Sequence, residues 1–164
     1  PAWEGGRYPK GRGPAAGLAA ARAIAMITYR SEAEFEQRFG RRQLRSPERF
    51  DVDGYLRHQG EKLVARFDAR SYLTLMDAMD HHDLGDLEAA AAETAERVDR
   101  VVGVGIDSDI LYPAAAVRDW VDRYRAAGAP AAYREITSIY GHDAFLIELH
   151  QVGAALTAGI EATV

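Results

Sequence analysis

Apolar residues recur at helical spacing through the first 97 positions of the chain. Leu18, Ala21, Ala25 and Tyr29 lie three or four residues apart, which predicts a helix over residues 15–29. Similar spacing, interrupted by glycines and polar runs, predicts further helices over residues 31–40, 52–67, 69–79 and 87–97. The helix over 52–67 is expected to bury a stripe that contains Tyr55, Leu56, Leu63, Val64 and Phe67.

Local signals mark several boundaries of these helices. Ser31 and Glu34 form a capping box, in which the serine hydroxyl accepts from a backbone N–H three residues on. Gly40 is placed to end the same helix. Residues 1–14 are rich in glycine and proline and predict irregular backbone, whereas residues 41–50 are basic and polar and predict a loop.

The pattern changes at residue 98 from helical spacing to short, fully apolar runs. Residues 101–106 are β-branched and apolar on both faces, which is typical of a buried parallel strand. A helix over 114–127, a strand over 132–136 and a helix over 145–156 follow. Strand, helix and strand in this order predict a right-handed crossover in a parallel sheet. Because two strands do not form a stable sheet alone, we expect the earlier strands to lie outside these 164 residues.

Composition restricts the class of protein. The chain is 48% hydrophobic and 27% charged, which suits a globular domain, and its net charge is −5. It carries no basic stripe for nucleic acid, no apolar run of membrane-spanning length and no cysteine for a disulfide or a thiolate metal site. We therefore expect no nucleic-acid or membrane partner, no metal, and a cytoplasmic protein. Because it begins at Pro1, we expect either that a segment was removed or that it is a piece of a longer protein.

The candidate chemistry centres on His142, which follows Gly141 after the second predicted strand. Histidine is the side chain best suited to move protons near neutral pH. Asp109, which follows the first predicted strand, is expected to accept from its Nδ1–H and fix its tautomer. The alternatives are that His142 is a hydrogen-bonded structural histidine and that Asp109 caps the helix after Pro113 or stabilises a turn. Asp107 is the nearby rival to Asp109 and is taken for a turn residue.

Other polar side chains are candidates for substrate contacts. Arg22 and Tyr29 are seven residues apart and so share a helix face, where an arginine suits a carboxylate. The alternative is that Arg22 lies on the helix surface and Tyr29 at the edge of the core. Asp143 is either an N-cap or a partner for a substrate ammonium. The run from Asp80 to Asp83 has metal-ligand residue types, but it lies in a loop between helices and lacks a metal-site pattern.

Together these residues resemble the homoserine O-acetyltransferase family. The match runs over nearly the whole chain with its spacing kept, which makes it more specific than any single motif. Residues 1–8, 17–22, 27–31, 39–41, 55–62, 66–72 and 78–80 resemble the family's helical lid, residues 108–113 match S-D-x-L-x-P, and residues 141–146 match G-H-D-A-F-L.

The resemblance implies an α/β-hydrolase fold, with residues 1–97 as the helical lid region and residues 98–164 as the carboxyl-terminal part of the core. It implies transfer of acetyl from acetyl-CoA to L-homoserine in methionine biosynthesis, with no other cofactor and a homodimer formed through the lid. By resemblance, Asp109 and His142 are triad members, Arg22 and Tyr29 bind the substrate carboxylate, and Asp143 binds its amine. No G-x-S-x-G elbow is present, so the nucleophile half is expected outside this chain, which alone should be inactive.

Two other interpretations are compatible with these residues. One is a relative of the same fold with a succinyl donor, a serine acceptor or plain esterase activity. The other is a non-catalytic module whose lid helices only dimerise. A nucleophile elbow upstream of Pro1 would favour the enzyme over the module.

Overall fold

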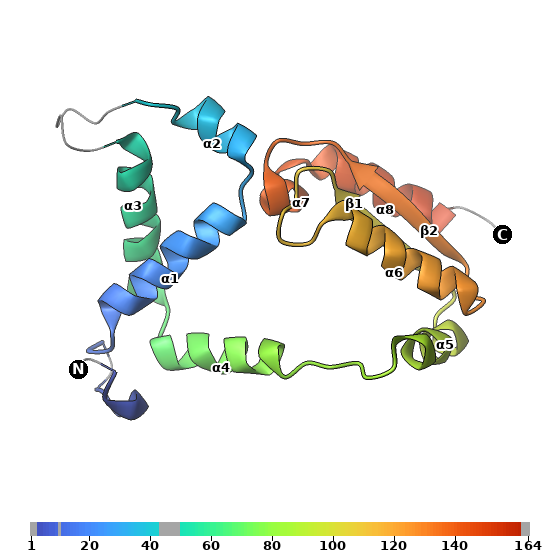
Figure 1. The fold of residues 1–164 in the computed structure, drawn as a ribbon, viewed down its shortest axis with the longest axis horizontal. Coiled ribbons are helices and arrows are strands. Elements are labelled where there is room, and N and C mark those ends of the chain that lie inside the picture. Colours follow the sequence, from blue (N-terminus) through green and yellow to red (C-terminus); the bar gives the residue numbers. More distant parts are fainter. Residues whose placement is uncertain (1–2, 10, 43–49, 162–164) are drawn as a thin grey trace. The chain divides into compact units, whose positions relative to one another are not determined.

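The computed structural model describes residues 3–9, 11–42 and 50–161 (Figure 1). Its helices are α1 (Ala15–Thr28), α2 (Glu32–Arg38), α3 (Asp51–Arg66), α4 (Ala69–Asp80), α5 (Leu87–Arg97), α6 (Ala114–Ala126), α7 (Ala144–Ile147) and α8 (Leu149–Glu161). Short 3₁₀ helices span Glu4–Gly6 and Gly141–Asp143, and the strands are β1 (Val101–Ile106) and β2 (Ala131–Ile136). The predicted loop over 41–50 lies largely outside the described residues.

The chain forms two compact units, residues 1–27 with 35–83, and residues 28–34 with 84–164. This division differs from the predicted boundary at residue 97. Helix α5 belongs to the second unit, where Glu88 pairs with Arg123 of α6. Residues 28–34 belong there as well, because they contact the segment that carries His142.

The first unit is a small helical cluster around one apolar core. Tyr8, Leu18, Leu63 and Ala69 are buried there, and Val64, Phe67 and Tyr72 pack against them. Helices α1 and α3 meet where a Cβ on Gly60 would lie 2.9 Å from the Cβ of Ala19. Only a glycine allows the two backbones to approach this closely. Three residues of the predicted apolar stripe, Leu63, Val64 and Phe67, belong to this core or pack against it.

Helix α4 buries less than its apolar sequence suggests. Leu73, Leu75 and Met79 are each about half exposed, at 47%, 56% and 58%. Its first turn is fixed by Asp68, whose carboxylate accepts from the backbone N–H of Arg70 at 2.9 Å. The apolar residues of α4 thus leave an exposed hydrophobic surface on the first unit.

The second unit is built on a two-stranded parallel sheet, as the sequence predicts. Val101 pairs with Ala131 and Ile106 with Ile136, so both strands end at the same edge. Helix α6 packs closely on the sheet at Gly103, where a Cβ would overlap the side chain of Val121.

Helix α8 packs on the same sheet at Gly159, where a Cβ would lie 2.5 Å from Val102 (Figure 1). Since neighbouring strand residues point to opposite faces, Val102 and Gly103 place α8 and α6 on the two faces of the sheet. The sheet is thereby covered on both sides within the second unit.

The predicted closing helix over 145–156 is wrong in one respect, because it is broken. Helix α7 ends at Ile147 and α8 begins at Leu149, with Glu148 between them at φ −84° and ψ 51°. The carboxylate of Glu148 accepts a hydrogen bond of 2.9 Å from the hydroxyl of Ser138. This tertiary contact accompanies the break in a segment whose sequence alone reads as continuous helix.

Within the described residues, no helix combines the length and the apolar composition that a membrane crossing requires.

The close packing at Gly103 gives a prediction about stability. Gly103→Ala should lower the free energy of unfolding by about 1–3 kcal/mol, because the new methyl has no room against Val121. The matched control is Gly153→Ala in α8, where a Cβ would meet nothing within 4 Å. That variant should gain roughly 0.5–1 kcal/mol from helix propensity. Urea denaturation measures both, and equal effects would contradict the packing described here.

Candidate active site

Asp109 is held rigidly just beyond the end of β1. Its side chain is only 4% exposed, and its Oδ1 accepts from the backbone N–H groups of Leu111 at 2.8 Å and Tyr112 at 3.0 Å. These bonds form an Asx-type turn that fixes the plane of the carboxylate. Its other oxygen, Oδ2, lies 2.9 Å from Nδ1 of His142. Asp109 therefore both stabilises a turn and contacts the histidine.

The contact with Asp109 defines the proton position on His142. A carboxylate only accepts, so Nδ1 carries the proton and Nε2 is the basic nitrogen. The imidazole is 24% exposed and lies among the rings of Tyr29, Tyr112 and Phe145, with centroid distances of 5.5, 5.3 and 5.4 Å. An oriented and partly exposed imidazole of this kind can act as a general base through Nε2.

Polar contacts at the strand ends hold the loop before His142. The hydroxyl of Ser108 donates to the carbonyl of Ser138 and accepts from the backbone N–H of Gly141 at 3.0 Å. Asp107 accepts from the backbone N–H of Ser138 at 3.0 Å and so joins the ends of β1 and β2. Asp107 braces the two strands, whereas Asp109 is the aspartate that contacts His142.

The segment between α1 and α2 supports the same loop from another direction. Gly141 has φ +61°, and a Cβ there would lie 2.9 Å from backbone atoms of Tyr29, Arg30 and Ser31. The backbone N–H of Asp143 donates to the carbonyl of Tyr29 at 3.2 Å. The glycine is thus required both for its left-handed backbone and for this close approach.

Ser31 links helix α2 to the loop. Its hydroxyl accepts from the backbone N–H of Glu34 at 3.1 Å, as the predicted capping box requires, and donates to the carbonyl of Ile139. The residues that cap α2 therefore also fix the path of the chain that enters the histidine loop.

Of the five predicted site residues, the second unit brings together Tyr29, Asp109, His142 and Asp143. Tyr29 lies one residue beyond the end of α1 at Thr28, so the predicted shared helix face does not extend to it. Arg22 lies on α1 in the first unit, and its role stays a prediction.

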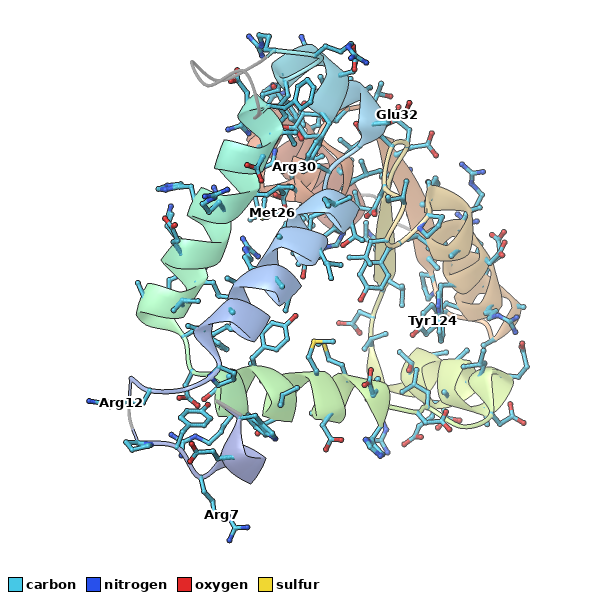
Figure 2. The ribbon with its side chains drawn as sticks, turned by 60° about the vertical axis from the view of Figure 1, so that its left-hand side comes forward. Arg7, Arg12, Met26, Arg30, Glu32 and Tyr124 are labelled. Atoms are coloured by element: carbon cyan, nitrogen blue, oxygen red, sulfur yellow. The ribbon has the colours of Figure 1, made fainter. Side chains whose placement is uncertain are left out.

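The carboxylate of Asp143 is already engaged by an arginine. Its Oδ2 lies 2.9 Å from Nε of Arg30, which Figure 2 shows in the connection between α1 and α2. Arg30, Tyr112 and Phe145 were not among the predicted site residues. The signal in the sequence that could have identified them is their position, because each lies within three residues of a predicted site residue.

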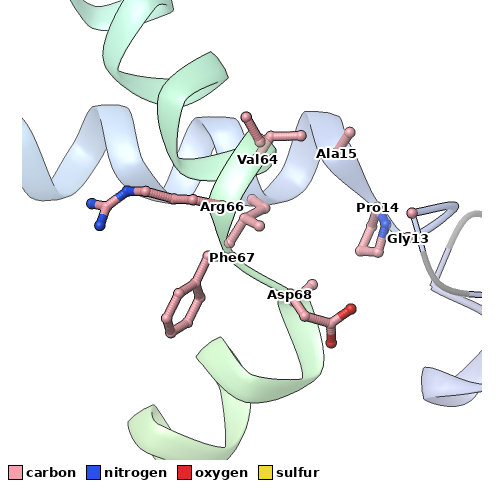
Figure 3. Close-up of a pocket in the computed structure, with 11 residues that line it drawn as sticks. Gly13, Pro14, Ala15, Val64, Arg66, Phe67 and Asp68 are labelled. Carbon is pink, nitrogen blue, oxygen red and sulfur yellow. The ribbon is translucent and has the colours of Figure 1, made fainter.

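A separate cavity of about 290 Å³ lies in the first unit, between the start of α1 and the α3–α4 connection (Figure 3). Leu18, Val64 and Phe67 contribute apolar lining, and Asp68 lies at its edge. A hydrogen bond from Arg70 holds the pKa of Asp68 below its ordinary value. Among the described residues, Tyr29, Asp109, Tyr112 and Phe145 contact His142, and these four are not part of the cavity lining.

The Asp80 to Asp83 run does not form a metal site in the structure. Across the described ranges, no group of three or more histidine, cysteine, aspartate or glutamate side chains is placed to hold a metal ion. Nδ1 of His81 instead lies 2.8 Å from the carbonyl of Asp77 on the preceding helical turn.

Comparison with known proteins identifies similar sequences over nearly the whole chain. An alignment of 170 positions to a homoserine O-acetyltransferase of Carboxydothermus hydrogenoformans shows 39% identity and covers 98% of the chain and 45% of that protein. It is 43% identical to the enzyme of that name from Moorella thermoacetica, covering 95% and 44%. For the Thermus thermophilus protein of the same name, identity is 46% and coverage 92% and 37%. The chain thus spans less than half the length of these relatives, and no family model matches it.

Solved structures show the same fold. A homoserine O-acetyltransferase from Bacillus anthracis superposes with a TM-score of 0.86 at 23% identity, covering all of this chain and 46% of the other. Esterase E22 superposes with a TM-score of 0.79 at 17% identity, covering 95% and 45%. At such identities the likeness shows fold alone, and it confirms the prediction of a partial α/β-hydrolase fold.

The fit of Gly141 against residues 29–31 gives a second prediction. Gly141→Ala should destabilise the protein more than Gly128→Ala. Both positions have positive φ, but a Cβ at Gly128 meets nothing within 4 Å. The control should therefore lose only the backbone term of about 1–2 kcal/mol, and Gly141→Ala should lose about 1–3 kcal/mol more from overpacking. Denaturant unfolding measures the difference, and equal losses would contradict the close approach.

Proposed function

Because the chain belongs to the homoserine O-acetyltransferase family and spans less than half the length of its relatives, we propose that it carries the general base of an acyltransferase active site and the aspartate that orients this base. Asp109 and His142 are two members of a catalytic triad, and the third is a serine outside these 164 residues. The observation that carries the proposal is the 2.9 Å contact between a fixed, buried Asp109 and the Nδ1 of His142.

The proposed reaction has two half-reactions that use the same base. In the first, Nε2 of His142 takes the proton of the serine hydroxyl, whose oxygen attacks the carbonyl carbon of acetyl-CoA. The bond from that carbon to sulfur breaks, and the imidazolium returns the proton to the departing thiolate of CoA. Asp109 stabilises the imidazolium while it exists.

In the second half-reaction, Nε2 of His142 takes the proton of the homoserine hydroxyl. The resulting oxygen attacks the acetyl carbon, the ester bond to the serine breaks, and the serine oxygen regains a proton from the imidazolium. The products are O-acetylhomoserine and the free serine. Water in place of homoserine would instead give ester hydrolysis, so discrimination between the two acceptors depends on how the amino acid is held.

We propose that homoserine, a zwitterion, is held at both of its charged ends. Arg22 and Tyr29 bind the carboxylate, and Asp143 binds the ammonium next to the base. The ring contact between Tyr29 and His142, at a centroid distance of 5.5 Å, supports this role. Since Asp143 uses Oδ2 for Arg30, we assign Oδ1 to the substrate amine.

The proposal extends to assembly and location. The exposed apolar residues of α4 support a homodimer formed through the helices of the first unit. A biosynthetic enzyme that consumes acetyl-CoA and homoserine for methionine would work in the cytoplasm.

Substitution of the two aspartates at the end of β1 tests the triad assignment. In the intact protein that contains residues 1–164, Asp109→Asn should lower kcat by on the order of 10³–10⁴, because it favours the wrong histidine tautomer. His142→Ala should abolish both half-reactions. Asp107→Asn is the matched control and should stay active, since its amide oxygen can still accept from Ser138. An active Asp109→Asn beside an inactive Asp107→Asn would refute the choice of aspartate.

Substitution of the acceptor residues tests the choice of substrate. Arg22→Ala and Asp143→Ala should each lower kcat/KM for homoserine by ~10²-fold, because each leaves one charged end of the substrate unpaired. Formation of the acetyl-enzyme should be nearly spared, since it does not involve the amino acid. A burst assay of CoA release measures the first step beside steady-state transfer. Arg57→Ala, which removes an exposed ion pair with Asp53 on α3, is the control. Equal loss of burst and transfer would show that these residues are structural.

A further inference from the structure

Arg30 makes two ion pairs, one with a residue four positions along its own segment and one with a residue far away in the sequence. Its Nε lies 2.9 Å from Oδ2 of Asp143, and its Nη1 lies 3.0 Å from Oε1 of Glu34. The side chains of Arg30, Glu34 and Asp143 are only 15%, 6% and 16% exposed. Two mostly buried carboxylates therefore share one guanidinium as a common counterion.

The Arg30 guanidinium offsets the repulsion between the carboxylates of Glu34 and Asp143. Partly buried charges are screened weakly, so two carboxylates around one cation would repel each other without it. Arginine suits this position because its separate nitrogens reach different carboxylates at once, whereas lysine offers a single ammonium.

The same two segments make further contacts around His142. The backbone of residues 29–31 lies against Gly141, the carbonyl of Tyr29 accepts from the N–H of Asp143, and Ser31 donates to the carbonyl of Ile139. These contacts hold the loop on both sides of the histidine.

We propose that Arg30 is a positioning residue, which serves as a counterion to both Glu34 and Asp143 and thereby ties residues 29–34 to the loop that carries His142. This inference rests on the proposed function for its catalytic consequence. Arg30 acts on the imidazole only through Asp143 and the backbone of the loop. Because His142 serves both half-reactions, misplacement of the loop slows both, and an error of ~1 Å can cost about 10²-fold in rate.

Kinetics of Arg30 variants in the intact protein test the proposal. Arg30→Gln should lower the rates of acetyl-enzyme formation and of transfer alike, by between ~10- and ~100-fold. This differs from Arg22→Ala, for which only transfer should fall. Arg30→Lys should be intermediate, since it keeps the charge but not the two-carboxylate geometry. The matched control is Arg118→Gln, which removes an exposed ion pair with Glu135 in the same unit and should leave both rates unchanged.

A second substitution separates electrostatic positioning from mere packing. Glu34→Gln in the Arg30→Gln background removes one of the two carboxylate charges that lost the Arg30 guanidinium, so the double variant should recover most of the lost rate. A packing role predicts no recovery, because Glu34→Gln does not replace the side-chain volume that Arg30→Gln removes. Failure of Glu34→Gln to restore the rate would overturn the proposal, as would a normal rate of acetyl-enzyme formation in Arg30→Gln.

Amide hydrogen exchange tests the proposal independently of acyl-transfer activity. Arg30→Gln should speed exchange in residues 139–143 of the intact protein, and Glu34→Gln should reverse the change. If the unmodified protein transfers no acetyl group while exchange behaves in this way, the proposed function fails and the positioning role stands. Unchanged exchange in Arg30→Gln would overturn the positioning role whatever the activity.

Discussion

The parallel register of β1 and β2 is the constraint on which the candidate site depends. With Ile106 opposite Ile136, both strands end at one edge of the sheet. The residues that follow, Asp109 after β1 and His142 after β2, therefore emerge at the same edge although 33 positions separate them. Catalytic groups of α/β proteins commonly stand at the carboxyl ends of parallel strands for this reason. A slip of one residue in this register would reverse which side chains face α6 and α8.

Fixed hydrogen bonds then convert this proximity into a defined geometry. One oxygen of Asp109 is fixed by two backbone N–H groups, which leaves the other to orient the imidazole. The loop is fixed through Ser108 on one side and Ser31 on the other. A buried carboxylate would be costly without such partners, so the polar groups that orient His142 also make the burial of Asp109 tolerable.

Much of this arrangement was predictable because it depends on local patterns. Helix α5 and strand β1 have the bounds that apolar spacing predicts, and the pairing of His142 with Asp109 follows from their places after two strands. The break at Glu148 was not predictable in this way, because it accompanies a tertiary hydrogen bond to Ser138. The role of residues 29–34 was hidden for a similar reason. Its contacts link positions more than 100 residues apart, and Arg30 reads locally as an ordinary polar residue after a helix.

The protonation state of His142 tests the central claim most directly. Selective ¹⁵N labelling of histidine in the intact protein distinguishes the two neutral tautomers by their nitrogen chemical shifts. The Asp109 contact predicts that the neutral ring is the Nδ1–H tautomer, in which Nε2 is the unprotonated nitrogen. It also predicts that Asp109→Ala changes this spectrum, whereas Asp107→Asn, which can still accept from Ser138, does not. A dominant Nε2–H tautomer, or a His142 signal that is indifferent to Asp109, would contradict the account.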